Sequence, residues 1–206
     1  MKVIFSLFLF MSLIMSFGCF FDDDDDSTEL PGSEIYLFGI PDRDGNLGGV
    51  SGANSLCKAA YNTTYSGKIS VANVKAFLSA DSYNIKDIIT SPGTKKIYAV
   101  KSDGTMTYLK VSWTELFNTG NSSLAATFRS SIDTLSPTHL TYNSYWWSGS
   151  DADGSEYSTS ANCSEWTVST GTGWTGFNTT SGDANWIDHS DQSCSNLNTL
   201  VCVGWN

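Results

Sequence analysis

The spacing of four cysteines constrains this chain more than any other feature. Cys57 stands alone in the first third of the chain, and Cys163, Cys194 and Cys202 follow close to its C-terminal end. No two of them have the Cys-x-x-Cys spacing with which small domains bind zinc. An even set of cysteines in an exported, loop-rich domain favours two disulfides over a metal site. The sequence therefore predicts a fold in which covalent links hold distant segments together.

The N-terminal residues have the parts of a secretory signal. Lys2 is followed by an apolar stretch from Val3 to Phe17, which is too short and too weakly flanked to predict a membrane-spanning helix. Cys19 comes directly after a small residue, and this arrangement resembles the relaxed lipobox of spirochaete lipoproteins, in which the cysteine sulfur is lipidated. We therefore expect a lipoprotein signal peptide over residues 1–18 and a lipid anchor on Cys19. A plain secretory signal and an uncleaved anchor helix are the alternatives.

An acidic segment separates Cys19 from the rest of the chain. The aspartates Asp22–Asp26 repel one another and cannot bury apolar surface, so we expect residues 19–33 to be a disordered, solvated tether. The tether would hold the following domain, residues 34–206, clear of the lipid headgroups. A calcium-chelating acidic run and an expression artefact are the alternatives. Because one acyl chain binds a membrane only marginally, stable anchoring requires that Cys19 carry several.

Charge is distributed unevenly along a chain whose net charge is −10. Lys and Arg are frequent between Lys58 and Arg129, and none lies between Ser130 and Asn206. The acidic residues of this C-terminal third are Asp133, Asp151, Asp153, Glu156, Glu165, Asp183, Asp188 and Asp191. Nucleic-acid binding is not expected, because it depends on clustered cations that neutralise phosphates. The acidic third could attract cations or a basic partner surface, or it could be an ordinary solvated face.

Short elements of both kinds are predicted in the first part of the domain. Residues Glu34–Ile40 alternate between apolar and polar as a strand does. A helix is expected over Ala53–Tyr61, with the Ser51 hydroxyl available as its cap. Val74–Leu78 and Ile97–Val100 have the patterns of strands. The chain therefore predicts a mixed domain rather than an all-helical or all-strand one.

Two local signals and one change in composition complete this prediction. Asp103-Gly104 is typical of a hairpin turn that leads into a strand over Met106–Val111. A Ser-x-x-Glu capping box at Ser112 predicts a short helix over Trp113–Phe117. From Ser136 onward Gly, Ser, Thr, Asn and Asp dominate, so we expect mostly loop in the last part of the chain.

Six landmarks in the chain follow one another as they do in endostatin. They are the glycine-rich run 45–53 leading to Cys57, and the segments 76–79, 112–117, 147–154, 163–166 and 194–202. They cover nearly the whole domain, and the chain resembles the endostatin family, including the leptospiral endostatin-like surface lipoproteins. The resemblance implies an α+β, C-type-lectin-like (endostatin-like) single domain. It also implies two nested disulfides, Cys57 with Cys202 and Cys163 with Cys194.

The chain departs from that family, and from sugar-binding lectins, at their ligand sites. Endostatin binds zinc through histidines near its N-terminus, whereas the only histidines here are His139 and His189. The clustered arginines of endostatin's heparin site and the Glu/Gln-Pro-Asn/Asp triplet of calcium-dependent lectins are also missing. We therefore expect no cofactor and no metal. Asp151 and Asp153 are the candidates for calcium, because carboxylates are hard oxygen donors, although Asp-x-Asp-Gly is also an ordinary polar turn.

No catalytic site is expected, and the chain is not predicted to be an enzyme. Asp188, His189 and Ser190 are the residue types of a hydrolase triad. Neighbours in sequence rarely converge on one site, however, and the chain has no Gly-x-Ser-x-Gly nucleophile elbow. This segment is therefore interpreted as part of the scaffold.

The resemblance implies a binding protein of the cell envelope. We expect a surface-exposed, lipid-anchored protein of the outer membrane that acts as an adhesin, since some leptospiral endostatin-like proteins bind laminin, fibronectin, plasminogen or factor H. One alternative is a glycan-binding module that depends on Trp174 or Trp186. The other is a structural envelope protein without a host ligand. Trp147, Trp166 and Trp186 are expected to pack in the core or on the disulfides rather than to form a sugar platform.

Overall fold

The computed structural model describes residues 34–109, 111–117, 131–132, 145–177 and 186–206. The expected signal peptide, Cys19, the tether, Arg129, Asp133, His139 and Asp183 lie outside the described residues. In the described part of the chain, no helix is long and apolar enough to cross a membrane.

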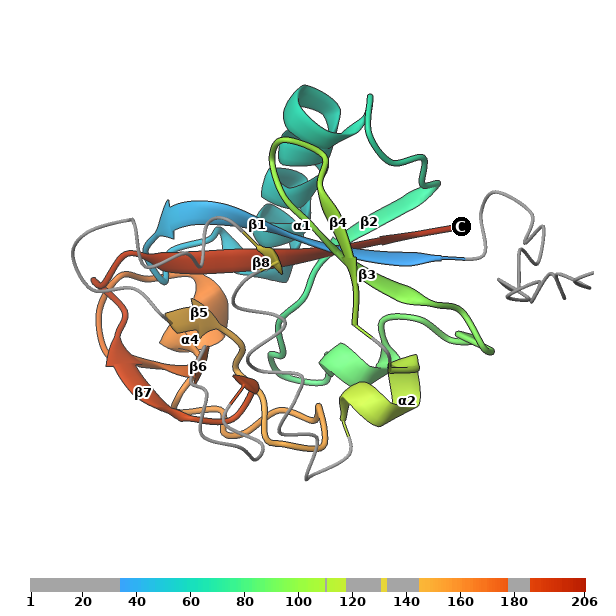
Figure 1. The fold of residues 1–206 in the computed structure, drawn as a ribbon. Coiled ribbons are helices and arrows are strands. Elements are labelled where there is room, and N and C mark those ends of the chain that lie inside the picture. The colour runs from blue at the N-terminus through green and yellow to red at the C-terminus, as the bar shows by residue number, and fades with distance from the viewer. Residues whose placement is uncertain (1–33, 110, 118–130, 133–144, 178–185) are drawn as a thin grey trace, which may run out of the picture.

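Two long strands form the centre of the fold. Strands β1 (Ile35–Arg43) and β8 (Asn198–Trp205) run antiparallel to each other across the molecule (Figure 1). The shorter strands are β2 (Asn73–Ala76), β3 (Ile97–Val100), β4 (Met106–Tyr108), β5 (Tyr145–Trp147), β6 (Thr172–Phe177) and β7 (Ser190–Ser193). The order is β4-β3-β1-β8-β5-β6-β7, and β2 also pairs with β8. The β1–β3 and β5–β8 pairs are parallel and the others are antiparallel.

Helix α1 (Gly49–Ala60) contacts β2 and β8 and continues into a π-helical turn (Tyr61–Tyr65). The other helical elements are a 3-10 turn (Ile85–Asp87), α2 (Trp113–Leu116) and α4 (Cys163–Trp166). All four residues of α4 have a positive φ, so this turn is left-handed. That conformation costs about 1–2 kcal/mol per residue outside glycine, so the surrounding contacts must hold it.

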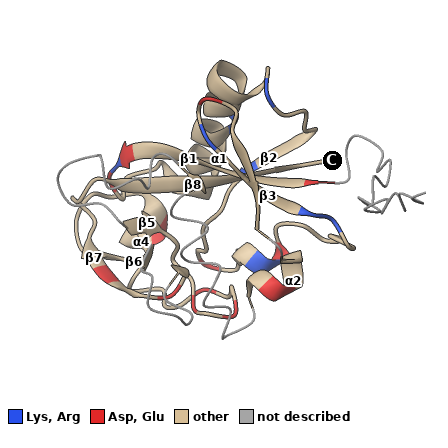
Figure 2. Ribbon diagram, viewed as in Figure 1, with Lys and Arg blue, Asp and Glu red and all other residues tan. Residues whose placement is uncertain are grey.

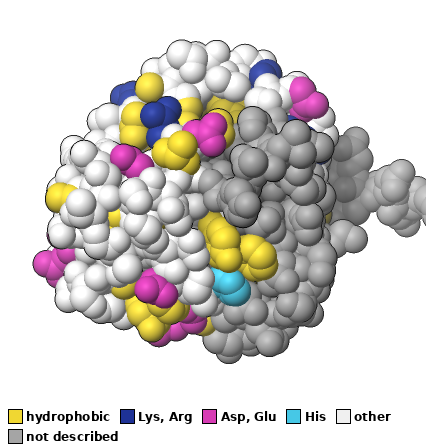
Figure 3. Space-filling view, turned by 90° about the vertical axis from the view of Figure 1, so that its left-hand side faces the viewer, with side chains coloured by type: hydrophobic (Ala, Val, Ile, Leu, Met, Phe, Trp, Pro, Cys, Tyr) yellow, Lys and Arg dark blue, Asp and Glu magenta, His cyan; other side chains and the backbone are white. Residues whose placement is uncertain are grey.

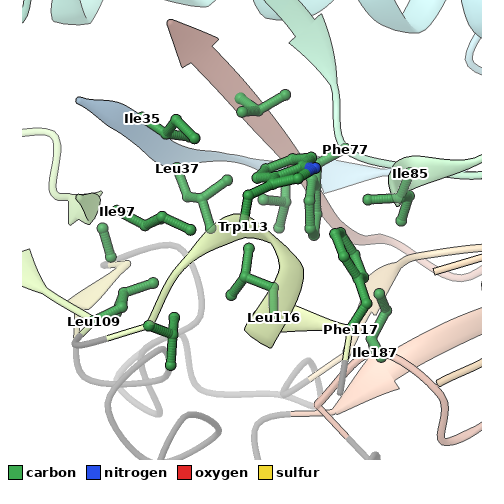
Figure 4. Packing of buried hydrophobic residues seen from close by; sticks show 14 of the residues in the cluster. Ile35, Leu37, Phe77, Ile85, Ile97, Leu109, Trp113, Leu116, Phe117 and Ile187 are labelled. Carbon is green, nitrogen blue, oxygen red and sulfur yellow. The ribbon is translucent and has the colours of Figure 1, made fainter. Parts of the chain in front are cut away.

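Strand β8 separates two apolar layers, because successive side chains of a strand point to opposite faces. Val201 and Val203 belong to a cluster that includes Phe77 and the side chains of α2 (Figure 4). Within it the rings of Phe77 and Trp113 meet edge to face, with 5.8 Å between their centroids. Leu200 and Cys202 belong to the second cluster, together with the buried face of α1. Both faces of β8 are therefore buried.

Both expected disulfides are present. Cys57 on α1 is bonded to Cys202 on β8, and Cys163 on α4 is bonded to Cys194, which directly follows β7. The second pair lies inside the sequence interval of the first, as the resemblance implied. The α+β fold with two nested disulfides is therefore confirmed.

The boundaries of the first elements differ from the expected ones. Strand β1 continues to Arg43, three residues beyond the end of the expected strand Glu34–Ile40. Helix α1 begins at Gly49 and is capped by Gly48 in the left-handed region, with no side-chain hydrogen bond, so the prediction of Ser51 as its cap is wrong. Glycine reaches this conformation without the steric cost that other residues incur, which is why the helix can begin without a polar cap.

Two local predictions are confirmed, and the last part of the chain contains strands that were not predicted. Strands β3 and β4 form the expected hairpin around Asp103-Gly104, and Ser112 and Glu115 form both hydrogen bonds of the capping box of α2. Most of the described residues after Ser136 do lie outside helices and strands, as expected, but the strands β5, β6, β7 and β8, which were not predicted, also lie there. Their glycines and small polar residues are accommodated by tertiary packing, which overrides local propensity.

Candidate interaction surface

One exposed aromatic side chain lies among acidic residues at the β6–β7 end of the molecule. Tyr157 is 44 % exposed, and its ring lies parallel to that of Trp174, with 3.6 Å between the two centroids and 4° between the planes. The Trp174 indole N–H donates to Asp188 Oδ1 at 2.7 Å. We call these two residues, with Asp151, Asp188 and Asp191, the aromatic–acidic patch.

Backbone hydrogen bonds fix the two aromatic residues of the patch. The Trp174 N–H donates to the carbonyl of Ala161, and the Trp174 carbonyl accepts from the N–H groups of Ser148 and Gly149. The Tyr157 N–H in turn donates to the Gly149 carbonyl at 2.9 Å. Both rings are therefore held by the same short segment, which immediately follows β5. A rigid aromatic pair loses little conformational entropy when a partner binds.

The carboxylates of the patch come from two segments: Asp151 follows β5, and Asp188 and Asp191 lie just before and within β7. Asp191 is the cross-strand partner of Trp174 in the β6–β7 pair, so both side chains lie on the same face of the sheet. Burial raises the pKa of Asp188, and the adjacent Asp151 carboxylate raises it further, while the indole N–H of Trp174 opposes the shift. The patch thus gathers negative charge around an apolar centre.

This arrangement is visible on the surface. Lys and Arg are absent from β5, β6 and β7, while acidic residues occur there (Figure 2). The face shown in Figure 3, which looks at the β6–β7 end, has hydrophobic side chains directly beside acidic ones. The unequal charge distribution noted in the sequence is therefore also a spatial one.

The two calcium candidates do not face each other. Asp151 lies beside Asp188, whereas Asp153 forms an ion pair with Lys86 at 2.8 Å. Hydrogen bonds from Lys86 and from the hydroxyl and N–H of Ser155 lower the pKa of Asp153 to about 2. Within the described ranges, no group of three or more His, Cys, Asp or Glu side chains could hold a metal ion. The Asp-x-Asp-Gly segment forms a turn in which the Gly154 N–H donates to the Asp151 carbonyl.

Asp188, His189 and Ser190, which are the residue types of a hydrolase triad, each contact a different part of the protein. Asp188 accepts the Trp174 indole N–H, and the His189 ring stacks on Phe177 with centroids 4.6 Å apart. Burial lowers the pKa of His189, with the Asp188 charge acting in the opposite direction. The Ser190 carbonyl accepts from the Thr175 hydroxyl. Chain neighbours on one strand edge therefore contact different partners.

The tryptophans divide as expected between core and surface. Trp147, Trp166 and Trp186 are all buried, which confirms their assignment to the core. Trp147 and Trp166 pack in the cluster that contains both disulfides. Trp186 is only 2 % exposed, so it offers no face to a sugar, and Trp174 is half-buried beneath Tyr157. Tyr157 is the residue that sequence reasoning missed, since a single tyrosine in a polar run carries no local signal.

The family comparison agrees with this fold. The model of the family described as Collagenase NC10 and Endostatin matches residues 38–206, which include all four disulfide cysteines and the whole aromatic–acidic patch. No curated protein matches the chain significantly. The match supports a binding module in general. The chain belongs to the endostatin family.

Proposed function

We propose that the protein is a lipid-anchored adhesin of the cell envelope. In this proposal Cys19 holds it at the outer membrane surface, and the aromatic–acidic patch binds a basic segment of an extracellular-matrix protein or a complement regulator. The observation that carries the proposal is the stack of Tyr157 on Trp174 among three carboxylates. Laminin, fibronectin, plasminogen and factor H are the partners to test.

The chemistry of the patch suits a basic protein segment. A Lys or Arg side chain can lie over the exposed Tyr157 ring, an interaction that contributes about 0.5–1 kcal/mol at exposed sites. Asp151, Asp188 and Asp191 attract the same cations and raise the rate of encounter. Aromatic residues are also enriched among those that dominate protein interfaces. The patch therefore combines an anchor with electrostatic steering.

Display on a membrane would add to the affinity of a single patch. Many copies fixed on one surface raise the effective concentration of binding sites for a repetitive matrix protein. Weak individual contacts can then hold a cell to a matrix. This effect requires the lipid on Cys19, which is part of the proposal.

The test is a binding titration of the purified protein, with both disulfides formed, on immobilised laminin, fibronectin, plasminogen and factor H. Tyr157→Ser is expected to weaken saturable binding by about tenfold, because it removes the exposed anchor. Tyr108→Ser is the matched control, since Tyr108 is 40 % exposed and lies on β4, away from the patch. Raising salt from about 0.05 to about 0.15 M should weaken the binding of the unaltered protein.

If the Tyr157 and Tyr108 variants lose equal binding affinity, or if binding does not depend on salt, the aromatic–acidic patch is not the binding surface. Absence of saturable binding to all four proteins would favour the structural envelope role instead. A glycan-binding module is the second candidate, favoured by the exposed face of Tyr157. That function predicts binding to a glycan array that is lost in Tyr157→Ser but is insensitive to salt.

A further inference from the structure

A groove of about 730 Å³ lies where β1 ends and α1 begins. None of the residues of the aromatic–acidic patch lines it. Its charged lining comes from Asp42, Arg43 and Asp44, and its apolar lining from Leu47, Leu56 and Leu197. Figure 2 shows basic and acidic residues together at this end of β1. The groove therefore offers both signs of charge beside apolar side chains.

Arg43 brings an unused guanidinium group to the groove. Its Nε is buried and has no hydrogen-bond partner. The only ion pair among the described residues joins Lys86 to Asp153, so Arg43 has no paired carboxylate either. Leaving a buried donor unsatisfied costs about 1–3 kcal/mol, more for a charged group. A side chain that is retained at this cost calls for a partner that the folded chain does not supply.

Asn198 supplies a second unsatisfied group next to Arg43. Its side chain is 1 % exposed, and neither Oδ1 nor Nδ2 has a hydrogen-bond partner. Asn198 is the cross-strand partner of Arg43 in the β1–β8 pair. Leu200 and Cys202, two and four residues further on, face the cluster that includes Leu47 and α1. By the alternation of a strand, the Asn198 amide faces this same side, but it is buried and is not one of the residues that line the groove.

The N-terminus of α1 contributes positive potential to the groove. Gly48 and Gly52 line it, and the Gly48 cap provides no side-chain acceptor for the first amides of the helix. The unpaired N–H groups at a helix N-terminus favour a bound carboxylate. Together with Arg43, this end of α1 gives the floor of the groove a positive potential.

The rim of the groove has the opposite charge. Asp44 accepts the Asn46 N–H at 3.2 Å, and neither Asp42 nor Asp44 forms an ion pair with Arg43. These carboxylates would repel a simple anion but attract a cationic group on the same ligand. Leu197, which is 50 % exposed, and Leu56 provide apolar surface between floor and rim.

We infer that this groove binds a zwitterionic ligand of the amino-acid type, either a free apolar amino acid or a short peptide with both ends charged. Its carboxylate contacts the Arg43 guanidinium and lies at the N-terminal end of α1, beside Gly48 and Gly52. Its ammonium group contacts Asp42 or Asp44. Its apolar side chain lies against Leu56 and Leu197. The inference goes beyond the proposed adhesin and uses none of the residues of its patch.

The test is a titration of the full-length, disulfide-bonded protein followed through its amide NMR signals. The probes are L-leucine, N-acetyl-leucine, which lacks the cation, and leucinamide, which lacks the anion. We expect leucine to shift the Gly48 and Gly52 signals saturably and each single-charge probe to bind about tenfold or more weakly. Equal binding of leucinamide would overturn the inference, as would no saturable shift at about 10 mM leucine.

Variants separate recognition of the ligand from folding. Arg43→Gln should weaken leucine binding by about tenfold, and Arg43→Lys is the second variant because it keeps the charge but loses the planar fork. Lys58→Gln is the matched control, since Lys58 is exposed in the last turn of α1 and lies outside the groove. Unchanged leucine affinity in both Arg43 variants would overturn the inference.

A tripeptide distinguishes between the two kinds of ligand, a free amino acid and a short peptide. Ala-Ala-Leu carries the same two charges as leucine on a longer chain. Binding of the tripeptide that is about tenfold tighter than that of leucine would assign the groove to peptides, and tighter binding of leucine would assign it to free amino acids. If the groove binds neither leucine nor the tripeptide, the adhesin proposal stands, because the Tyr157 variant tests a different surface.

Discussion

Gly45 lies against the sulfur of Cys163. A β-carbon built at position 45 would lie 2.3 Å from Cys163 Sγ and 2.9 Å from Cys194 Cβ, closer than atoms can approach. The Gly45 N–H also donates to the Cys194 carbonyl at 2.7 Å. The loop between β1 and α1 is thus fixed on a disulfide that lies more than a hundred residues further along the chain. This contact joins the early and late landmarks of the family.

The first prediction concerns this contact. Gly45→Ala should lower the free energy of unfolding by about 1–3 kcal/mol, because the methyl group must displace a disulfide that cannot move far. Urea unfolding of the oxidised protein measures this change. Gly67→Ala is the control, since nothing lies within 4 Å of a β-carbon at position 67, and it should be neutral or slightly stabilising. Equal destabilisation by both substitutions would contradict the role of the contact.

The second prediction compares the two disulfides. Cys57 and Cys202 are 145 residues apart and Cys163 and Cys194 are 31 apart. On loop-closure entropy, replacing the first pair by serine should cost about 5 kcal/mol and replacing the second about 3–4 kcal/mol. Urea unfolding of the two double variants ranks the losses. A larger loss from the Cys163–Cys194 pair would mean that its packing against α4 and Gly45 outweighs the entropy of the longer loop.

The early part of the fold could be predicted because its signals are local. The capping box of α2 needs only Ser112 and Glu115, and the β3–β4 hairpin needs only a turn and two flanking strands. The late strands could not be predicted in this way. By local propensity, Gly173 and Gly176 on β6 are typical of loops. A β-carbon would lie under 3 Å from Cys163 at position 173 and from Trp146 at position 176. These glycines are required by tertiary contacts, which no short window of sequence contains.

The candidate sites, too, could be predicted from the sequence only in part. The sequence locates the acidic third and Trp174, but it pairs Asp151 with Asp153, whereas the fold places Asp151 beside Asp188 and gives Asp153 to Lys86. The groove depends on the register that sets Arg43 opposite Asn198. That register joins residues from the two ends of the domain, so neither residue signals a site by itself.

The third prediction tests the hydrogen bond within the patch. Trp174→Phe keeps an aromatic ring beneath Tyr157 but removes the indole N–H that donates to Asp188. Because that bond favours the ionised carboxylate, the pKa of Asp188 should rise above its already raised value. An NMR pH titration of the Asp188 carboxyl carbon measures this shift. A lowered or unchanged pKa would show that the indole does not stabilise the charge. The stability cost should be about 1–2 kcal/mol.

The fourth prediction concerns the pH dependence of stability at a network under α4. The buried Asn162 amide donates to Glu156 Oε1 at 2.9 Å and to Glu165 Oε1 at 2.7 Å. Burial raises the pKa of Glu156, and the charges of Glu165 and Asp81 raise it further, against the hydrogen bond from Asn162. A raised folded-state pKa gives a stabilising contribution that is complete below the ordinary value of 4.5 and is lost as the pH rises through the raised value.

Glu156→Gln should therefore raise the melting temperature at pH 7 and have little effect near pH 4, because glutamine keeps the acceptor for Asn162 but cannot ionise. Glu115→Gln is the opposite control. The backbone and side chain of Ser112 lower the pKa of Glu115 in the capping box, so its carboxylate stabilises the fold above the ordinary pKa. Its replacement should lower the melting temperature at pH 7 and lose that effect on acidification. Melting curves of both variants from pH 4 to pH 7 should thus diverge in opposite directions as the pH rises, and parallel curves would refute the assignment of Glu156 as a destabilising charge.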